Sequence, residues 1–301
     1  MKESISIKLF NTLQRGKEQL SKEALDRIIG FIESQRTEEE SFINKSGKAD
    51  LYYTLFGWML SYILGIRLNV EKAGLYLNKQ NIESLDLIHY AAYTRCRMIL
   101  RLQERGKIGF ALTSLLPTGT KSLQEFNGLP HNDPWSPYTQ FIQLSLQEDT
   151  RHKKNDKKEV LDALAAYHVS TGGFMNTTDG LTATTNATVA ALAVTGQLTG
   201  YKENADVRYL RDLQESSGGF GAAEASPVPD LLSTATSLFM LSCYKIQPKY
   251  SARDFIEAHW LESGGFSATL LEDKSDVEYT FYGLLALGAC SQEVQSSTFK
   301  R

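Results

Sequence analysis

The residues best suited to acid chemistry are the carboxylates in the stretch EDKSDVE, from position 272 to position 278. Neighbouring carboxylates raise each other's pKa, so one member of such a group can stay protonated and act as an acid. Asp276 and Glu278 are the catalytic candidates in this stretch, and Asp230 holds the equivalent place 46 residues earlier. The alternative is that these acids only cap a helix, because the stretch leads into an apolar segment.

Metal and cofactor chemistry finds little support. The five histidines show no metal-ligand spacing, and no Cys-x-x-Cys pair exists. His89 lies three residues after Asp86 and seven before Cys96, so a small metal site at these residues is one interpretation. The alternative is that Asp86 caps a helix, His89 is a polar side chain and Cys96 is a buried thiol. Phosphate-binding loops, dinucleotide fingerprints and hydrolase motifs are absent from the sequence. The sequence predicts neither a metal nor a cofactor.

A repeat of 46 residues positions these groups. The tripeptide Gly-Gly-Phe begins at positions 172, 218 and 264, and a threonine follows each phenylalanine by fourteen residues, at Thr188, Thr234 and Thr280. An apolar segment follows each threonine, and the same pattern continues upstream with more drift. The predicted repeat starts are Asp50, Asp86, Asp133, Thr184, Asp230 and Asp276.

Each repeat reads as two helices. The segment before each Gly-Gly-Phe has one apolar stripe, as in Val207, Leu210 and Leu213, which is typical of a helix with one buried face. We expect the glycine pair to end that helix. The helix after each start is apolar nearly all round, so it is buried on several sides. The sequence therefore predicts an all-α protein, an α/α toroid of about six helix-pair repeats, forming a single domain over residues 1–301.

Composition agrees with a globular domain. Hydrophobic residues make up 42% and charged residues 22% of the chain, which excludes a disordered class. The net charge of -3 argues against a nucleic-acid partner, and no apolar run is long enough for a membrane span. The charged run from 148 to 159 is predicted to be a solvated connection. Three separated cysteines and the absence of a secretory apolar region predict a cytoplasmic protein.

The repeat resembles that of the prenyltransferase and squalene-oxidase family. The likeness rests on Ser217-Gly-Gly-Phe-Gly221 with 230–241, on Ser263-Gly-Gly-Phe266 with 276–288, and on Asp50-Leu-Tyr-Tyr-Thr-Leu-Phe-Gly57. This family includes the β subunits of protein prenyltransferases and the barrel domains of class II terpenoid cyclases. The resemblance implies an α/α toroid whose central cavity holds isoprenoid chains.

The catalytic signatures of that family are not reproduced. The zinc site of protein prenyltransferases would fall on Asp230, Leu232 and Tyr279, of which only the aspartate can serve as a good ligand. The Asp-x-Asp-Asp acid of class II cyclases is absent, since the sequence has no Asp-Asp dipeptide. A zinc centre of the prenyltransferase type is therefore not expected.

Aromatic residues near the helix starts could line the cavity implied by the resemblance. Aromatic faces stabilise carbocations and pack against polyprene chains, although such residues also commonly fill cores. A diphosphate would need positive charge, which Arg95, Arg97, Arg101, Arg105 and Lys107 could supply, unless they form an exposed face. The predicted ligand-binding residues are Tyr53, Trp58, His89, Trp135, Tyr138, Tyr279 and Tyr282.

The leading hypothesis is a protein that binds isoprenoid or similar hydrophobic ligands, such as a prenyl diphosphate, and that could be a divergent enzyme of the cyclase or prenyltransferase kind. The alternative is a non-catalytic toroid that binds a ligand or a protein partner. The missing catalytic signatures favour the alternative, and the aromatic helix starts favour the first hypothesis.

Overall fold

Helices make up nearly all the regular structure. A computed structural model describes residues 3–115, 134–151, 155–224 and 226–297, with the backbone alone for 105–115 and 291–297. Within these ranges the only sheet is one hairpin of two short antiparallel strands, β1 (Phe42–Ile43) and β2 (Ala49–Asp50). The predicted all-α class is therefore confirmed.

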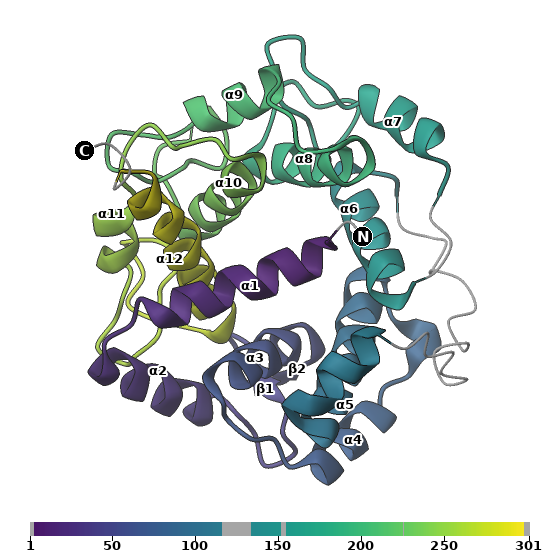
Figure 1. The fold of residues 1–301 in the computed structure, drawn as a ribbon, viewed down its shortest axis with the longest axis vertical. Helices are drawn as coiled ribbons and strands as arrows, with labels where there is room; N and C mark the ends of the chain where they lie inside the picture. The colour runs from purple at the N-terminus through teal and green to yellow at the C-terminus, as the bar shows by residue number, and fades with distance from the viewer. Residues whose placement is uncertain (1–2, 116–133, 152–154, 225, 298–301) are drawn as a thin grey trace.

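Six helices form an inner ring (Figure 1). Each contacts the next one along the chain, and the last packs against the first, so the ring is closed. Most of these helices are apolar on nearly all sides because neighbouring helices flank them, whereas the two helices between positions 87 and 150 carry more polar and charged side chains. The inner ring consists of α3 (Leu51–Leu64), α5 (Leu87–Leu115), α6 (Pro137–Thr150), α8 (Thr185–Thr199), α10 (Leu231–Tyr244) and α12 (Val277–Ser297).

Shorter helices form an outer layer, each just before an inner helix in the sequence. In α9, Val207 and Leu210 are buried while most of the remaining helix meets solvent, as the single apolar stripe predicts. The segment before α6 includes 116–133, so the predicted start at Asp133 lies outside the described residues. The described outer helices are α2 (Lys22–Ser34), α4 (Val70–Asn78), α7 (Lys157–Ala165), α9 (Ala205–Asp212) and α11 (Arg253–Ala258).

Side-chain caps begin the inner helices. Asp50, Thr184 and Asp230 are N-cap residues, each accepting a hydrogen bond from the backbone N–H three residues on. Asp86 and Asp276 accept in the same way, from the N–H of His89 and of Tyr279, both at 2.8 Å. α6 differs, because Ser136 caps it through a capping box with Thr139. Repeat starts in the sequence therefore mark helix starts in space.

A buried hydrogen bond explains the fourteen-residue spacing. The backbone N–H of Phe220 donates to Thr234 Oγ1 at 2.9 Å, and that hydroxyl donates to the carbonyl of Asp230 at 2.7 Å. The phenylalanines at 174 and 266 bond in the same way to the threonines at 188 and 280. One shared bond therefore ties each turn to the first turn of the following inner helix.

The glycine pairs do not end the outer helices, contrary to the expectation. α9 ends at Asp212, and the pair lies later, in a turn where the N–H of Gly218 donates to the carbonyl of Glu215. Gly218 has φ of 91°, which favours glycine, whereas Gly219 does not have a positive φ.

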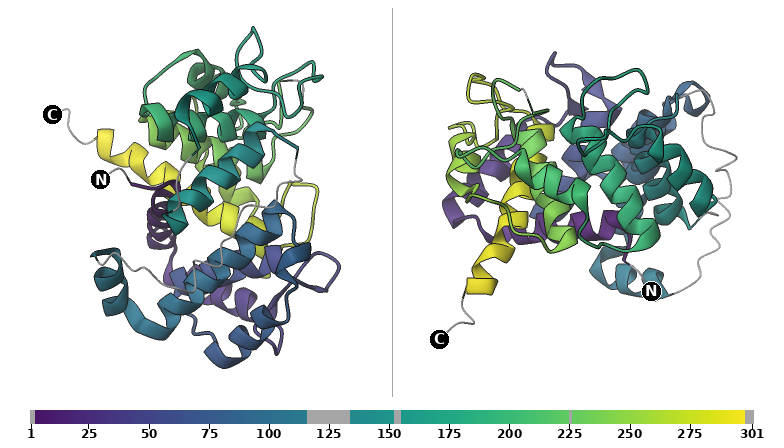
Figure 2. Two further views of the ribbon diagram at one scale, coloured as in Figure 1. Left: turned by 90° about the vertical axis from the view of Figure 1, so that its right-hand side faces the viewer. Right: turned by 90° about the horizontal axis from the view of Figure 1, so that it is seen from above.

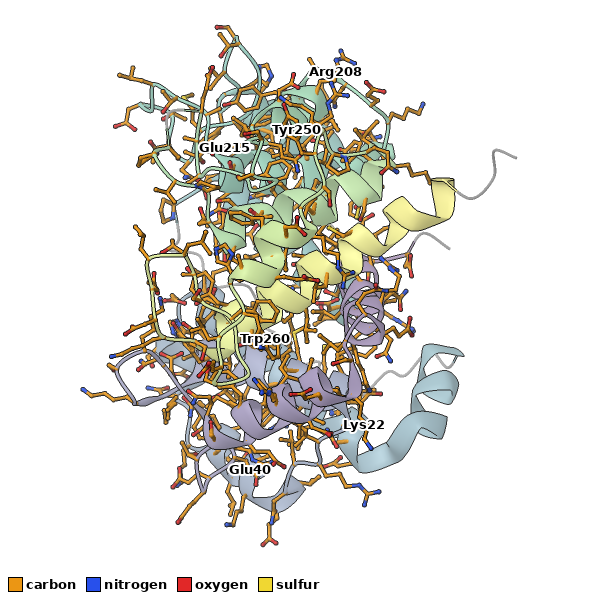
Figure 3. All side chains as sticks on the ribbon, turned by 90° about the vertical axis from the view of Figure 1, so that its left-hand side faces the viewer. Lys22, Glu40, Arg208, Glu215, Tyr250 and Trp260 are labelled. Carbon is orange, nitrogen blue, oxygen red and sulfur yellow. The ribbon has the colours of Figure 1, made fainter. Side chains whose placement is uncertain are left out.

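In the last repeat, Trp260, labelled in Figure 3, packs against Phe266 with ring centroids 5.1 Å apart.

Helix α1 (Ile5–Glu18) lies across one face of the ring, opposite the loops that precede the inner helices (Figure 2). It packs mainly along α12, where Gly16 and Gly288 let the two backbones approach so closely that a Cβ on either would collide with the other helix. The face with the loops is called here the helix-start face. Across the part of the chain that the structure describes, no helix is long and apolar enough to cross a membrane.

Candidate functional site

The inner ring encloses a cavity of about 640 Å³. All six inner helices contribute to its wall, and α1 contributes Ile5, Ser6, Leu9 and Phe10 from the opposite face. This volume falls within the range of about 300–1,000 Å³ that is typical of small-molecule sites. Many aromatic residues of the ring therefore surround an open space, while others belong to the core. The aromatic lining residues are Phe10, Tyr52, Phe56, Tyr62, Tyr138, Phe141, Phe239, Phe281 and Tyr282.

Two of the predicted ligand-binding residues, Tyr138 and Tyr282, line this cavity. Tyr282 packs against Phe56 with ring centroids 5.9 Å apart, and burial raises the pKa of its phenol well above the usual value. Both phenols therefore stay protonated at neutral pH and offer hydrogen bonds within an apolar wall.

Two other predicted aromatics lie just behind the wall. Tyr53 packs edge-on against Tyr52, a lining residue, and Tyr279 lies 6.2 Å from the ring of Tyr282. These two side chains support residues that face the cavity. Trp135 instead packs against Tyr167, at 4.9 Å between ring centroids, and neither of them lines the cavity.

Trp58 belongs to the core and not to the cavity wall, contrary to the prediction. Its side chain is fully buried, and its Nε1 donates to the carbonyl of Glu40 at 2.7 Å. On α3 the cavity face carries residues 52, 55, 56, 59 and 62, one stripe of the helical period. Position 58 falls on another face of the helix. Because α3 is apolar throughout, the sequence pattern could not tell its cavity face from its core face.

His89 lies in a small depression on the helix-start face. Tyr52, Ile88 and Tyr138 line both this depression and the large cavity, so the two adjoin. The ring Nδ1 of His89 lies 2.8 Å from Asp86 Oδ1, an exposed pair at the helix start. The position suits the rim of an entrance.

Of the three predicted catalytic carboxylates, Glu278 is the one hydrogen-bonded to a residue of the cavity wall. Tyr52 OH donates to its Oε1 at 2.9 Å, and Tyr52 itself lines the cavity. Burial raises the pKa of Glu278, and the nearby charge of Asp276 adds to that rise, while hydrogen bonds from Tyr52 and Tyr53 and the charge of Lys45 oppose it. Glu278 thus reaches the cavity through a tyrosine hydroxyl.

Asp276 and Asp230 hold the same capping position but differ in their polar contacts. Asp276 is buried, which raises its pKa, and its Oδ2 lies 3.8 Å from Lys45 Nζ. Asp230 accepts hydrogen bonds from both the N–H and the hydroxyl of Ser233, at 2.7 and 2.8 Å. Both aspartates cap helices, and neither lines the cavity.

A polar cluster of which the sequence indicated only Arg95 lies where α1 meets the cavity. Arg95 donates from Nε to Asp149 Oδ2 at 3.0 Å and from Nη2 to Ser145 Oγ at 2.7 Å, and Ser6 Oγ donates to the same Asp149 oxygen. All four line the cavity, and they are called here the polar floor. Burial raises the pKa of Asp149, whereas the charge of Arg95 lowers it.

The predicted solvated run from 148 to 159 therefore begins too early. Glu148 and Asp149 belong to the last turn of α6, where Asp149 is almost fully buried and Glu148 accepts the N–H of Ile5. Of the other predicted cations, Arg97 donates to Asn78 Oδ1 at 3.3 Å. The side chains of Arg105 and Lys107 lie outside the described residues.

Potential metal ligands do not converge in the described part of the chain: no three His, Cys, Asp or Glu side chains gather there in a metal-binding arrangement. At the positions of the prenyltransferase ligands, Leu232 lines the cavity and the ring of Tyr279 lies under Lys45 Nζ, at 4.8 Å. Cys96 is fully buried in the core, whereas His89 on the same helix α5 is only partly buried.

A family match and one solved structure support this architecture. Residues 114–300 match the family description "Prenyltransferase alpha-alpha toroid domain". A crystal structure of a protein from Actinoplanes aligns with 90% of this chain and 99% of its own, with a TM-score of 0.53 and 10% identity. The apo structure of the type II terpene cyclase MstE from Scytonema aligns with 91% of this chain and 98% of its own, with a TM-score of 0.49 and 10% identity. A search of curated protein sequences found no match.

Proposed function

Because the chain belongs to the prenyltransferase alpha-alpha toroid domain family, we propose that its central cavity binds an isoprenoid or a similar hydrophobic molecule. The observation that carries this proposal is the open cavity of about 640 Å³, with its aromatic and aliphatic wall. An apolar chain leaving water for such a wall gains about 0.8 kcal/mol for each buried methylene. Tyr138 and Tyr282 are the predicted residues assigned to direct contact, and His89 is assigned to the rim.

Chain-length dependence tests the proposal. Calorimetric titration with prenyl alcohols of ten, fifteen and twenty carbons should give an affinity that rises with length until the cavity is full. Thr236→Trp should abolish binding, because Thr236 lines the cavity and the indole would occupy it. Thr199→Trp, the same change at an exposed position on α8, should leave binding intact. Equal affinities across the series, or none in a folded protein, would refute the proposal.

Acid chemistry on the bound chain is a second candidate function, favoured by the contact between Glu278 and Tyr52. A buried carboxyl with a raised pKa keeps its proton at higher pH than an exposed one does. Tyr52 would transfer its hydroxyl proton to an alkene carbon of the ligand while protonated Glu278 donates its own proton to the Tyr52 oxygen, which leaves a carbocation on the ligand and a carboxylate at Glu278. Loss of a proton from a carbon next to the cation, returned through Tyr52 to Glu278, would give an isomer and restore the acid. Asp276 is assigned the role of raising the pKa of Glu278, and Asp230 that of a cap.

The acid function has a product as its readout. Incubation with a polyunsaturated prenyl chain should yield isomers of unchanged mass that separate by gas chromatography. Glu278→Gln should remove this activity while leaving affinity for the chain in place. Unchanged substrate with a protein that binds it would favour the alternative, a non-catalytic toroid that holds a ligand.

A cytoplasmic location remains part of the proposal. It is supported by the cysteine usage, since the three cysteines, Cys96, Cys243 and Cys290, are odd in number and far apart in the sequence. Such a pattern is typical of a reducing compartment and not of a disulfide framework.

A further inference from the structure

The polar floor, which lines the cavity, has hydrogen-bonding capacity that no described residue uses. Among the lining residues that the structure describes, Arg95 is the only cation and Asp149 the only carboxylate. Their mutual bond uses Arg95 Nε and Asp149 Oδ2, and Ser145 takes Nη2. No hydrogen bond from a described residue reaches Arg95 Nη1 or Asp149 Oδ1. One donor group and one acceptor are therefore left at the base of an apolar space.

The pair is electrically neutral as a unit. The two side chains are only 19% and 6% exposed, so the guanidinium and the carboxylate compensate each other with little help from bulk water. An added anion would gain from Arg95 but would be repelled by Asp149. A hydrocarbon end would cover both groups without satisfying either, which costs free energy.

We propose that the polar floor recognises a hydroxyl group at one end of the ligand. A hydroxyl oxygen accepts a hydrogen bond from Arg95 Nη1, and its own hydrogen is donated to Asp149 Oδ1. This inference rests on the proposed binding function and narrows its ligand to a neutral alcohol with an apolar body.

The shape of the cavity fits a ligand with a polar end and an apolar body. Tyr138 at the helix-start face and Asp149 at the polar floor are eleven residues apart on α6, which places their backbones about 16 Å apart along the helix axis. Between these levels the wall is largely aliphatic and aromatic. The apolar body would lie there, with its far end toward the helix-start face.

Three probes with the same fifteen-carbon chain test the inference: farnesol, farnesene and farnesyl diphosphate. Farnesol should bind about tenfold more tightly than farnesene, because hydrogen bonds to charged groups contribute more than neutral ones. Farnesol should also bind more tightly than the diphosphate. Asp149→Asn removes the compensating charge and leaves Arg95 cationic, so this variant should favour the diphosphate over the alcohol. Asp212→Asn, the same change in an exposed ion pair with Lys249, should keep the original order.

The possible results separate the two proposals. Equal affinities for farnesol and farnesene, with clear binding of both, would overturn the hydroxyl site and leave the hydrophobic site standing. Tighter binding of the diphosphate by the unmodified protein would also overturn it. An unchanged order in a folded Asp149→Asn protein would remove Asp149 from the site. If none of the three probes binds, both proposals fail. The comparison on the unmodified protein decides the question even where the variant does not fold.

Discussion

Two neighbouring units of the ring keep the repeat less closely than the other four. Around α8, α10 and α12, a threonine in the first turn of the inner helix holds the preceding Gly-Gly-Phe turn through its hydroxyl. At the same place in α5 and α6, the residues are Tyr90 and Gln140. Both charged residues of the cavity wall, Arg95 and Asp149, come from these two drifted helices.

The regular units build the closed ring, whereas the two drifted units place charged residues in the cavity wall. Regular repeats supply stacking units whose contacts recur from neighbour to neighbour, as in other repeat proteins. A unit that departs from the pattern can place side chains that no repeat would supply. Here the departures coincide with the polar floor, so the drifted units distinguish one region of the cavity from the rest.

The largest expected effect is on the drifted side. Arg95→Met leaves the carboxylate of Asp149 buried without its guanidinium and should cost about 3 kcal/mol or more in unfolding free energy. Adding Asp149→Leu should restore much of that loss, because the unpaired charge is gone. Urea unfolding of the single and double variants measures both terms. A double variant less stable than the single would contradict a buried ion pair.

The turns of the regular side should respond next. Gly218→Val should cost about 2–4 kcal/mol, because its φ of 91° is strained for a side chain and a Cβ would meet the backbone at Ser251. Gly219→Val should also destabilise, through collision with the ring of Phe255 instead of backbone strain. Gly30→Ala in α2, where a Cβ meets nothing within 4 Å, should stabilise by about 0.5–1 kcal/mol. Thermal melting compares the three, and a neutral Gly218→Val would show that the turn is not constrained.

The threonine hydroxyl shared by two hydrogen bonds in each regular repeat should contribute less to the free energy of unfolding. Thr234→Val removes the acceptor of the buried Phe220 N–H and should cost about 1–3 kcal/mol. The matched change Thr199→Val at an exposed position should stay within about 0.5 kcal/mol. Chemical denaturation of the pair checks this. Equal effects would mean that the fourteen-residue spacing reflects packing alone.

The smallest expected effect concerns pH. The pKa of Glu278 is raised above its ordinary 4.5, so the folded state keeps a proton that the unfolded chain has lost as pH rises past that value. The free energy of unfolding therefore falls through that window. Glu278→Gln lacks this term, so its stability relative to the unmodified protein should improve as pH rises above about 4.5 and stay constant below it. A difference that does not vary with pH would show that Glu278 ionises normally.

The architecture could be predicted well from the sequence because each repeat carries the same pattern of turn residues and apolar segments. The constant spacing of Gly-Gly-Phe and threonine, and the change from amphipathic to fully apolar segments, are enough to predict paired helices and their starts. The choice between Gly218 and Gly219 for the positive φ could not be made, since both are glycines in one turn.

The site was harder to predict because it depends on long-range contacts. Trp58 lies in an all-apolar helix, where periodicity does not say which side faces the cavity. Asp149 lies in a charged run that looks solvated, and its burial depends on Arg95 and on Ser6, which is 143 residues away. No local pattern reports such a partner.

The close packing of α1 on α12 has a kinetic consequence. Arg15 donates to the carbonyl of Gly288, a contact across 273 residues, and Gly16 and Gly288 bring the two backbones together. Contacts of such separation carry a large loop-closure entropy, so they form late and slow the search. Neighbouring units can assemble from local contacts as an open arc, whereas the ring closes only once α12 is in place. Until then the arc would expose apolar edges, and recognition between the edges of two copies would compete with closure.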